Sequence, residues 1–161
     1  MFYESTFFRE RQSYNFAHMK KTSIDPQKYV FMSSFLLPEG MLDFFDVVRI
    51  DEEPLSQEKV YRGGILHIYL DELDNRTKEQ ESLISNGFTE PTLINDFPIR
   101  DRKVVLHIRR RRWLDAEGHN VVLNVYNLAT KGTRYSEEFA AFLKERLGYL
   151  PSDGTFAGVL L

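Results

Sequence analysis

The chain has 161 residues, with 21 Lys and Arg against 24 Asp and Glu, and its formal net charge at pH 7 is −3. This length supports one ordinary domain with a core and is too short for two. The chain has no cysteine, which excludes disulfides and thiolate metal sites, and no apolar run approaches the ~20 residues needed to cross a bilayer. We therefore expect a folded cytoplasmic protein without a membrane span.

The first predicted elements are a short helix and a β-hairpin. Asp25 is a suitable N-cap and Pro26 a suitable first helical residue, and the helix should end before Pro38. Residues 43–51 are rich in β-branched and aromatic side chains, and residues 65–71 alternate in the manner of a strand. The two segments are predicted to pair as a hairpin.

The middle of the chain predicts three further strands. Residues 74–85 are charged and fit either a helix or a loop. Strands are expected over residues 92–98, 103–114 and 121–126, with Val104, Leu106 and Ile108 on the core side of the second. The same parity would carry Arg110 and Arg112 toward the core beyond the point where the core must stop, so a twist or bulge is expected there.

The last predicted element is a helix that begins after Ser136 and stops at Gly148. Glu137 and Glu138 suit its first turn, and an apolar stripe around Phe139 is expected to dock a partner chain. The resulting fold class is α+β. We expect a disordered or misassigned start over residues 1–22, a single domain over residues 23–148 and a tail over residues 149–161.

Charge is distributed unevenly along the chain. Residues 96–134 contain nine basic and four acidic residues, whereas acidic residues predominate over residues 43–81, which predicts an electrically two-faced molecule. Arg109 to Arg112 are consecutive on a predicted strand, and Trp113 offers a stacking face beside them. Guanidinium groups held by a sheet can meet phosphate oxygens at little ordering cost. The residues predicted to bind DNA are Arg100, Arg102, Lys103, Arg109, Arg110, Arg111, Arg112, Trp113, Lys131 and Arg134.

A structural interpretation stays open beside the DNA hypothesis. The arginines could end a solvated strand and form salt bridges with Asp96, Asp101 or Asp115, and Trp113 could be a core residue. His67 and His107 fit hydrogen-bonded strand histidines better than metal ligands.

Catalysis by this chain is not expected. Asp71, Glu72 and Asp74 could be metal-binding carboxylates of a nuclease, but adjacent acids on a strand point to opposite faces and nothing pairs them with a base or a nucleophile. The sequence also lacks a nucleophile elbow and a phosphate-binding glycine loop. We therefore expect no catalytic residue, no metal and no cofactor.

Several blocks together resemble the transposase N-terminal region of the IS-Aon-type insertion sequences. The resemblance covers roughly residues 32–148. The blocks that carry it, in order, are LLPEG (36–40), LHIYLDE (66–72), GF (87–88), DFPIR (96–100), VLHIRRRRW (105–113), ATKGTR (129–134) and FAAFLKE (139–145).

This group in turn resembles DDE transposases that begin with a strand hairpin and a zinc ribbon. The two cysteine pairs of that ribbon would fall near residues 85–87 and 114–120, where this chain has no cysteine and only His119 as a strong zinc ligand. The resemblance therefore implies a metal-free, zinc-ribbon-like three-stranded sheet between the hairpin and the C-terminal helix.

The resemblance also implies a function without chemistry. The chain would be a non-catalytic DNA-binding part of a transposase, contacting double-stranded DNA at the element ends. The catalytic subunit would be encoded separately or reached by frameshifting. The alternative is a protein-interaction or assembly module for that subunit with little DNA binding of its own, and a homodimer is left open.

Overall fold

The computed structural model describes residues 26–54 and 64–151. The expected disordered or misassigned start over residues 1–22 lies outside these ranges, as does most of the expected tail. The elements in chain order are α1 (Pro26–Ser34), α2 (Met41–Phe44), β1 (Phe45–Glu53), β2 (Gly64–Glu72), the 3-10 helix η2 (Lys78–Gln80), β3 (Ile84–Phe88), β4 (Thr92–Ile99), β5 (Arg102–Arg109), β6 (Arg111–Leu114), β7 (Asn120–Val122) and α3 (Glu137–Leu147).

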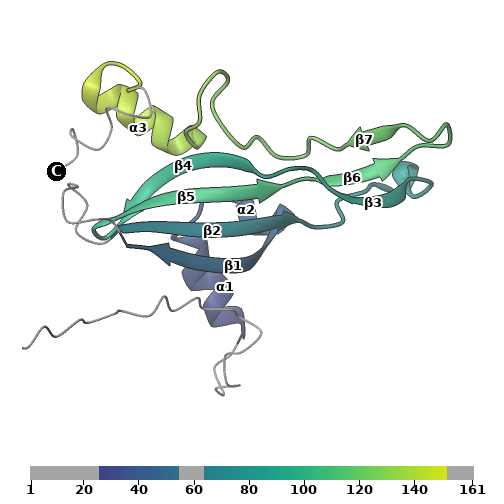
Figure 1. Ribbon diagram of the computed structural model, residues 1–161, viewed down its shortest axis with the longest axis horizontal. Coiled ribbons are helices and arrows are strands. Elements are labelled where there is room, and N and C mark those ends of the chain that lie inside the picture. The colour runs from purple at the N-terminus through teal and green to yellow at the C-terminus, as the bar shows by residue number, and fades with distance from the viewer. Residues whose placement is uncertain (1–25, 55–63, 152–161) are drawn as a thin grey trace, which may run out of the picture.

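Four strands form one mixed sheet in the order β1-β2-β5-β4 (Figure 1). β1 and β2 are antiparallel, with Phe45 opposite Glu72 and Glu53 opposite Ile65, which confirms the predicted hairpin. β4 and β5 form a second antiparallel pair, and β5 lies parallel to β2. The expectation that the segments of β4 and β5 belong to the three-stranded unit is therefore wrong. They join the hairpin instead, because Val104, Leu106 and Ile108 extend its buried face.

The predicted strand over residues 103–114 is interrupted at Arg110 and passes from one sheet to the other. Thr89 holds this break, since its N–H donates to the Arg110 carbonyl (2.8 Å) and its hydroxyl accepts from the Arg110 N–H (3.0 Å). The interruption lies where the parity of the pattern predicts a twist or bulge. Beyond it, β6 forms an antiparallel three-stranded sheet in the order β3-β6-β7, which extends from the end of the larger sheet (Figure 1).

Two of the strands in the smaller sheet differ from expectation. β3 covers Ile84–Phe88, so it begins within the last two residues of the segment 74–85, for which the sequence fits either a helix or a loop. β7 covers only Asn120–Val122, so the predicted strand over residues 121–126 is shorter than expected. Tyr126 instead packs its ring against Phe44 and Phe45, with ring centroids 5.4 and 6.0 Å apart. This packing draws the chain after β7 back toward the larger sheet.

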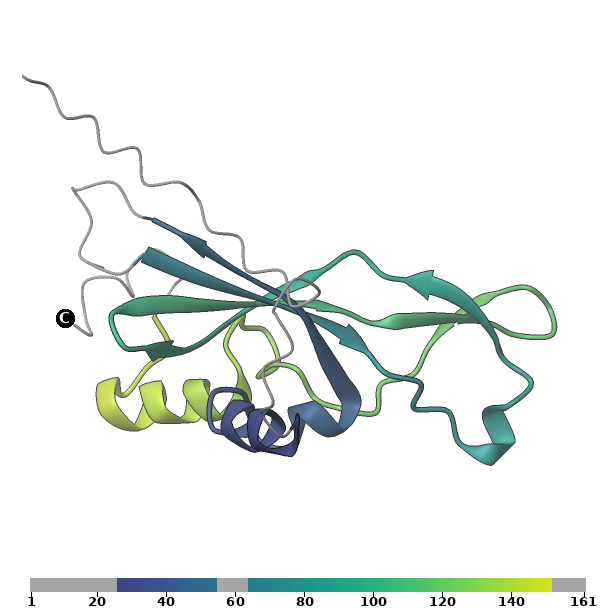
Figure 2. The ribbon, with the colours of Figure 1, turned by 90° about the horizontal axis from the view of Figure 1, so that it is seen from below.

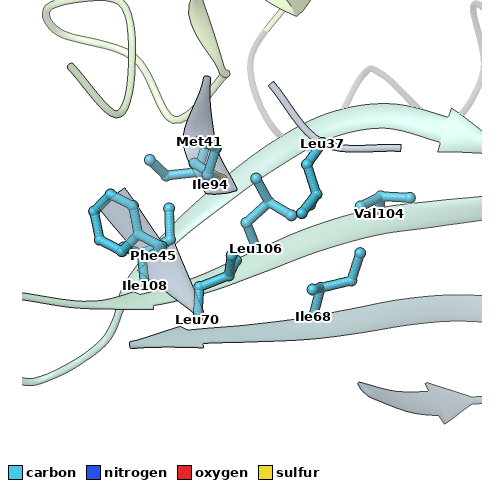
Figure 3. Close-up of a cluster of buried hydrophobic side chains, with 9 residues drawn as sticks. All are labelled: Leu37, Met41, Phe45, Ile68, Leu70, Ile94, Val104, Leu106 and Ile108. Carbon is cyan, nitrogen blue, oxygen red and sulfur yellow. The ribbon is translucent and has the colours of Figure 1, made fainter. Parts of the chain in front are cut away.

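The main hydrophobic core covers one face of the four-stranded sheet (Figure 3). Figure 2 shows the helices on one side of this sheet and no described helix on the other. Strand alternation explains the asymmetry, because every second residue of β2 and β5 points away from the core. The core consists of Leu37, Met41, Phe45, Ile68, Leu70, Ile94, Val104, Leu106 and Ile108.

The C-terminal helix has the predicted ends. The Ser136 hydroxyl accepts a hydrogen bond from the Phe139 N–H at 3.3 Å, and Gly148 ends the helix in the left-handed conformation with φ 78°. Phe139, Ala140 and Leu143 are buried within the chain. Much of the stripe that was expected to dock a partner chain is therefore covered within this chain, and docking there stays a prediction.

Candidate functional site

The four consecutive arginines lie in four different environments because the chain changes sheets among them. Arg109 ends β5, Arg110 occupies the break, and Arg111 and Arg112 begin β6. A continuous strand would alternate these side chains between two faces. The break instead points successive side chains at different parts of the molecule, so each has to be considered separately.

Arg109 forms an ion pair on the face of the sheet that points away from the helices. Its Nε and Nη2 donate to the two Asp71 carboxylate oxygens, at 2.7 and 2.5 Å. Parallel pairing of β2 and β5 sets Asp71 directly beside Arg109. The hydrogen bonds to Asp71 raise the pKa of the Arg109 guanidinium further above its usual value. With 46% of its side chain exposed, this is a surface pair.

Arg110 belongs to a buried polar cluster that ties the two sheets together. Its Nη1 lies 3.3 Å from Glu72 Oε1, and its Nη2 donates to the Tyr126 carbonyl at 2.6 Å. Glu72 is only 2% exposed and also accepts from the Arg111 N–H at 2.8 Å. Burial raises the pKa of Glu72, although the Arg111 N–H and the Arg110 charge act in the opposite direction. Arg110 is therefore used inside the fold.

The side chains of Arg111 and Trp113 also make contacts within the chain. The Nε of Arg111 donates to the Glu72 carbonyl at 3.2 Å, and its guanidinium lies 4.9 Å from the Phe88 ring centroid. Trp113 is 2% exposed, and the guanidinium of Arg76 covers its ring at 4.3 Å. The expectation of an open stacking face at Trp113 is therefore not met, because its ring lies in the interior.

The remaining predicted bases divide between paired and unpaired side chains. Arg102 donates to Glu52 and to Asp101, both at 2.9 Å. Over residues 26–54 and 64–151, no ion pair involves Arg100, Lys103, Arg112 or Lys131, and the Nε of Arg112 is buried without a hydrogen-bond partner. Arg100 lies at the tip between β4 and β5 with a positive φ of 60°. Lys131 and Arg134 are exposed in the segment before α3.

The expected separation of charge into two faces is not found. β2 lies beside β5, so the acidic residues of the first hairpin are adjacent to the arginines of the later strands. The pairs Arg102–Glu52, Arg109–Asp71 and Arg110–Glu72 all join these two regions. The alternative of intramolecular salt bridges describes these arginines better, with Asp71 and Glu72 as partners rather than Asp96 or Asp115. Neutralisation across the sheet reduces the field that would attract DNA.

Each of the three carboxylates considered as nuclease metal ligands is paired with a different arginine. Asp71 holds Arg109, Glu72 holds Arg110, and Asp74 binds Arg76 at 2.8 Å. The hydrogen bond from Arg76 lowers the pKa of Asp74 to about 2.

A different trio, Asp115, Glu117 and His119, has ligand atoms within 4.8 Å of one another. Asp115 already accepts the backbone N–H groups of Glu117 (3.0 Å) and His119 (2.8 Å). Those bonds shape the β6–β7 turn, so the arrangement has an ordinary structural explanation.

His67 and His107 form a hydrogen-bonded pair on the outer face of the sheet, as the sequence suggests for strand histidines. His67 Nδ1 lies 2.8 Å from His107 Nε2, and His67 Nε2 lies 3.3 Å from the Glu53 carboxylate. Burial and the neighbouring His67 lower the pKa of His107. His107, but not His67, lines a groove of about 590 Å³ that Arg49, Tyr69 and Arg109 also line. Arg49 lies over the Tyr69 ring at 3.7 Å and His107 stacks on it at 4.3 Å, so stacking partners already occupy this ring.

Comparison with protein-family models, curated proteins and solved structures gave no match. Among the described residues, no helix has the length and apolar character needed to cross a membrane. The functional argument therefore depends on the surface of the molecule itself.

The most distinctive surface is one that the sequence argument missed, on α1 and the turn after it. Its members are Val30 (59% exposed), Phe31 (65%), Met32 (66%), Phe35 (71%) and Leu36 (49%), and we call these five residues the α1 surface. No α1 side chain that the structure describes is buried. Residues 29–32 and 35–37 are all apolar or aromatic, more positions than one core-facing stripe requires, and that excess is the signal available in the sequence.

A groove of about 330 Å³ continues the α1 surface toward the rest of the domain. Phe35 to Pro38 form one wall and Phe97 to Ile99 form much of the other, with Glu138 at the margin. The Glu39 N–H donates to the Glu138 carboxylate at 2.7 Å and fixes the turn against the start of α3. The apolar side chains of the turn are therefore held in place while they face solvent.

Proposed function

We propose that this chain is a non-catalytic assembly part of an insertion-sequence transposase, which binds another protein chain through the α1 surface. The observation that carries this proposal is the exposure of five large apolar side chains together on one short segment. Soluble monomers rarely expose contiguous apolar patches of several hundred Å², and such patches usually mark protein contacts. Assembly is therefore the role that the geometry supports best.

The arginine run supports the same choice by its orientation. Phosphate binding requires basic side chains that are free to neutralise phosphates and so release the counterions condensed on the DNA. Arg109 is paired with Asp71, and Arg110 and Arg111 are bound to Glu72, so three of the four arginines already have partners in the chain. Freeing Arg110 would leave a buried carboxylate uncompensated, which costs several kcal/mol.

The link to transposases is supported by the smaller sheet. The resemblance places two ribbon segments near residues 85–87 and 114–120, which a zinc ion would join in the related proteins. Here Ser85 pairs with Trp113 across β3 and β6, and the Asn86 side chain donates to the Asn120 side chain at 2.6 Å. The two segments thus meet through direct hydrogen bonds. We propose on this basis that β3-β6-β7 is a metal-free, zinc-ribbon-like unit.

The experiment that tests the assembly role measures binding to the catalytic transposase chain that the proposal expects to be encoded separately, near this gene. Biolayer interferometry would compare the wild type with the double variant F31E/F35E. Ile84→Glu is a matched control, because Ile84 is 66% exposed but lies on β3. The proposal expects F31E/F35E to lose most of the binding while I84E keeps it. Equal binding by all three proteins would refute a role for the α1 surface.

DNA contact is a second candidate, and the observation that favours it is the set of bases without ion pairs. Arg100, Lys103 and Lys131 have no ion-pair partner among the described residues, so they could neutralise phosphates at no cost in broken pairs. The triple variant R100A/K103A/K131A should then weaken DNA binding and reduce its salt dependence. Arg109→Ala is the comparison, since Arg109 is already paired. Equal effects of the two changes would remove this version of DNA contact.

A further inference from the structure

We propose that the α1 surface binds the α1 surface of a second copy of this chain, so that the protein is a homodimer with a twofold axis at α1. The inference rests on the proposed function, because it names the occupant of the surface that function requires.

The helix α1 lacks the features that would make it stable without a packing partner. Isolated helices shorter than about 12–15 residues are marginal in water, and α1 has 9. Its sequence, PQKYVFMSS, includes Tyr, Val, Phe and two Ser, which are middling or weak helix formers. None of its described side chains is buried against the domain. A packing partner outside the described residues would supply the stability that α1 lacks.

The α1 surface and the residues around it carry almost no charge. Lys28 is the only charged residue among residues 26–37. In a twofold interface the same patch of both copies meets, so a patch with charge of one sign would repel its copy, whereas a neutral apolar patch is self-complementary. The composition of this surface therefore favours a second copy.

The shape of the α1 surface also suits a second copy of the same chain. Phe31 and Phe35 pack edge to face with ring centroids 4.9 Å apart, which holds two large rings as one projecting unit. The groove of about 330 Å³ begins beside this unit at Phe35 and Leu36. Projection and groove are thus adjacent on the same chain. In a twofold pair, the rings of each copy can enter the groove of the other.

The size of the surface predicts a reversible dimer. The two phenylalanine side chains, each about two-thirds exposed, offer roughly 200–350 Å² per copy on the basis of about 150–250 Å² for a whole aromatic residue, and the three aliphatic side chains raise the total to roughly 500 Å². Two copies would bury about 1,000 Å² in total, close to the lower limit for a specific interface. We therefore expect dimerisation that depends on protein concentration.

Sedimentation velocity across a wide concentration series tests the inference. The wild type should shift from monomer to dimer as concentration rises, F31E/F35E should stay monomeric with an unchanged far-UV circular dichroism spectrum, and I84E should behave as the wild type. A wild type that is monomeric throughout, or an F31E/F35E variant that still dimerises, would overturn the proposal.

A crosslinking experiment keeps the proposal testable without disturbing the apolar residues. The chain has no cysteine, so Ser34→Cys places a single thiol at the exposed end of α1. Under mild oxidation S34C should form disulfide-linked dimers much faster than Ser82→Cys, which places its thiol at another exposed serine. Equal rates for the two variants would contradict a twofold axis at α1.

These results separate the two proposals. A monomeric wild type that binds the catalytic chain through Phe31 and Phe35 would refute the second copy and leave the assembly role intact. A dimer that fails to bind the catalytic chain would support the second copy and refute assembly with that subunit.

Discussion

Neighbouring arginines should differ sharply in their contribution to stability. Arg110 contacts the buried Glu72 carboxylate and donates to the carbonyls of Leu123 (3.3 Å) and Tyr126 (2.6 Å), with 13% of its side chain exposed. Removing one member of a buried pair costs about 3–5 kcal/mol, because the other charge is left uncompensated. Arg109→Ala breaks an exposed pair, for which about 1 kcal/mol or less is expected. Arg110→Ala should therefore lower the free energy of unfolding several times more than Arg109→Ala.

Urea denaturation followed by far-UV circular dichroism measures both values, and unchanged m-values would show that the unfolding transition is comparable. Combining Arg110→Met with Glu72→Gln removes both charges and should cost less than the sum of the single changes. Small and similar losses for Arg109→Ala and Arg110→Ala would refute the buried cluster. They would indicate instead that Arg110 is a surface residue available to DNA.

Three further outcomes follow from the structure. Gly64→Ala should lower the melting temperature more than Gly118→Ala, because both glycines have positive φ but, of the two, only at Gly64 would a Cβ clash with a backbone atom, the Glu53 carbonyl oxygen. Burial raises the pKa of Asp96, so its favourable contribution is complete below the usual pKa of 3.8 and is lost as the pH rises through the raised value. Asp96→Asn, whose amide oxygen can still accept from the Ser136 hydroxyl, should therefore stabilise the fold at neutral pH and lose that advantage in acid, and an equal urea midpoint for both proteins at neutral pH would argue against it. The pKa of His107 is lowered, so its contribution to stability is present above its usual pKa of 6.5 and is lost as the pH falls through the lowered value. Its NMR titration midpoint should therefore lie below pH 6.5 and should rise in the His67→Gln variant. A midpoint at or above pH 6.5 in the wild type would contradict the paired geometry.

Local signals predicted the elements of this fold well. The start of α1 at Pro26, the first hairpin, and the two ends of α3 at Ser136 and Gly148 all follow from residues whose conformational preferences are strong. Alternation also identified the buried face of β5. These features depend on neighbours within a few residues, which is the range over which a single sequence carries information.

The pairing of strands could not be predicted in the same way. Alternation specifies which face of a strand is buried but not which strand lies beside it. No local pattern therefore indicated that β5 lies parallel to β2, and that pairing is what brings Asp71 to Arg109. After the interruption at Arg110 the chain enters the smaller sheet as β6, so the alternation along β5 no longer applies to Trp113, which is buried.

The proposed function requires that this chain acts through protein contact and that its arginine run is structural. Fluorescence anisotropy of the purified chain with the DNA that flanks its gene, and with a scrambled duplex, across a salt series tests this most directly. We expect weak binding that is the same for both duplexes and is unchanged by the double variant R109A/R111A. Tight, salt-sensitive binding that prefers the flanking DNA and is lost in that variant would contradict it.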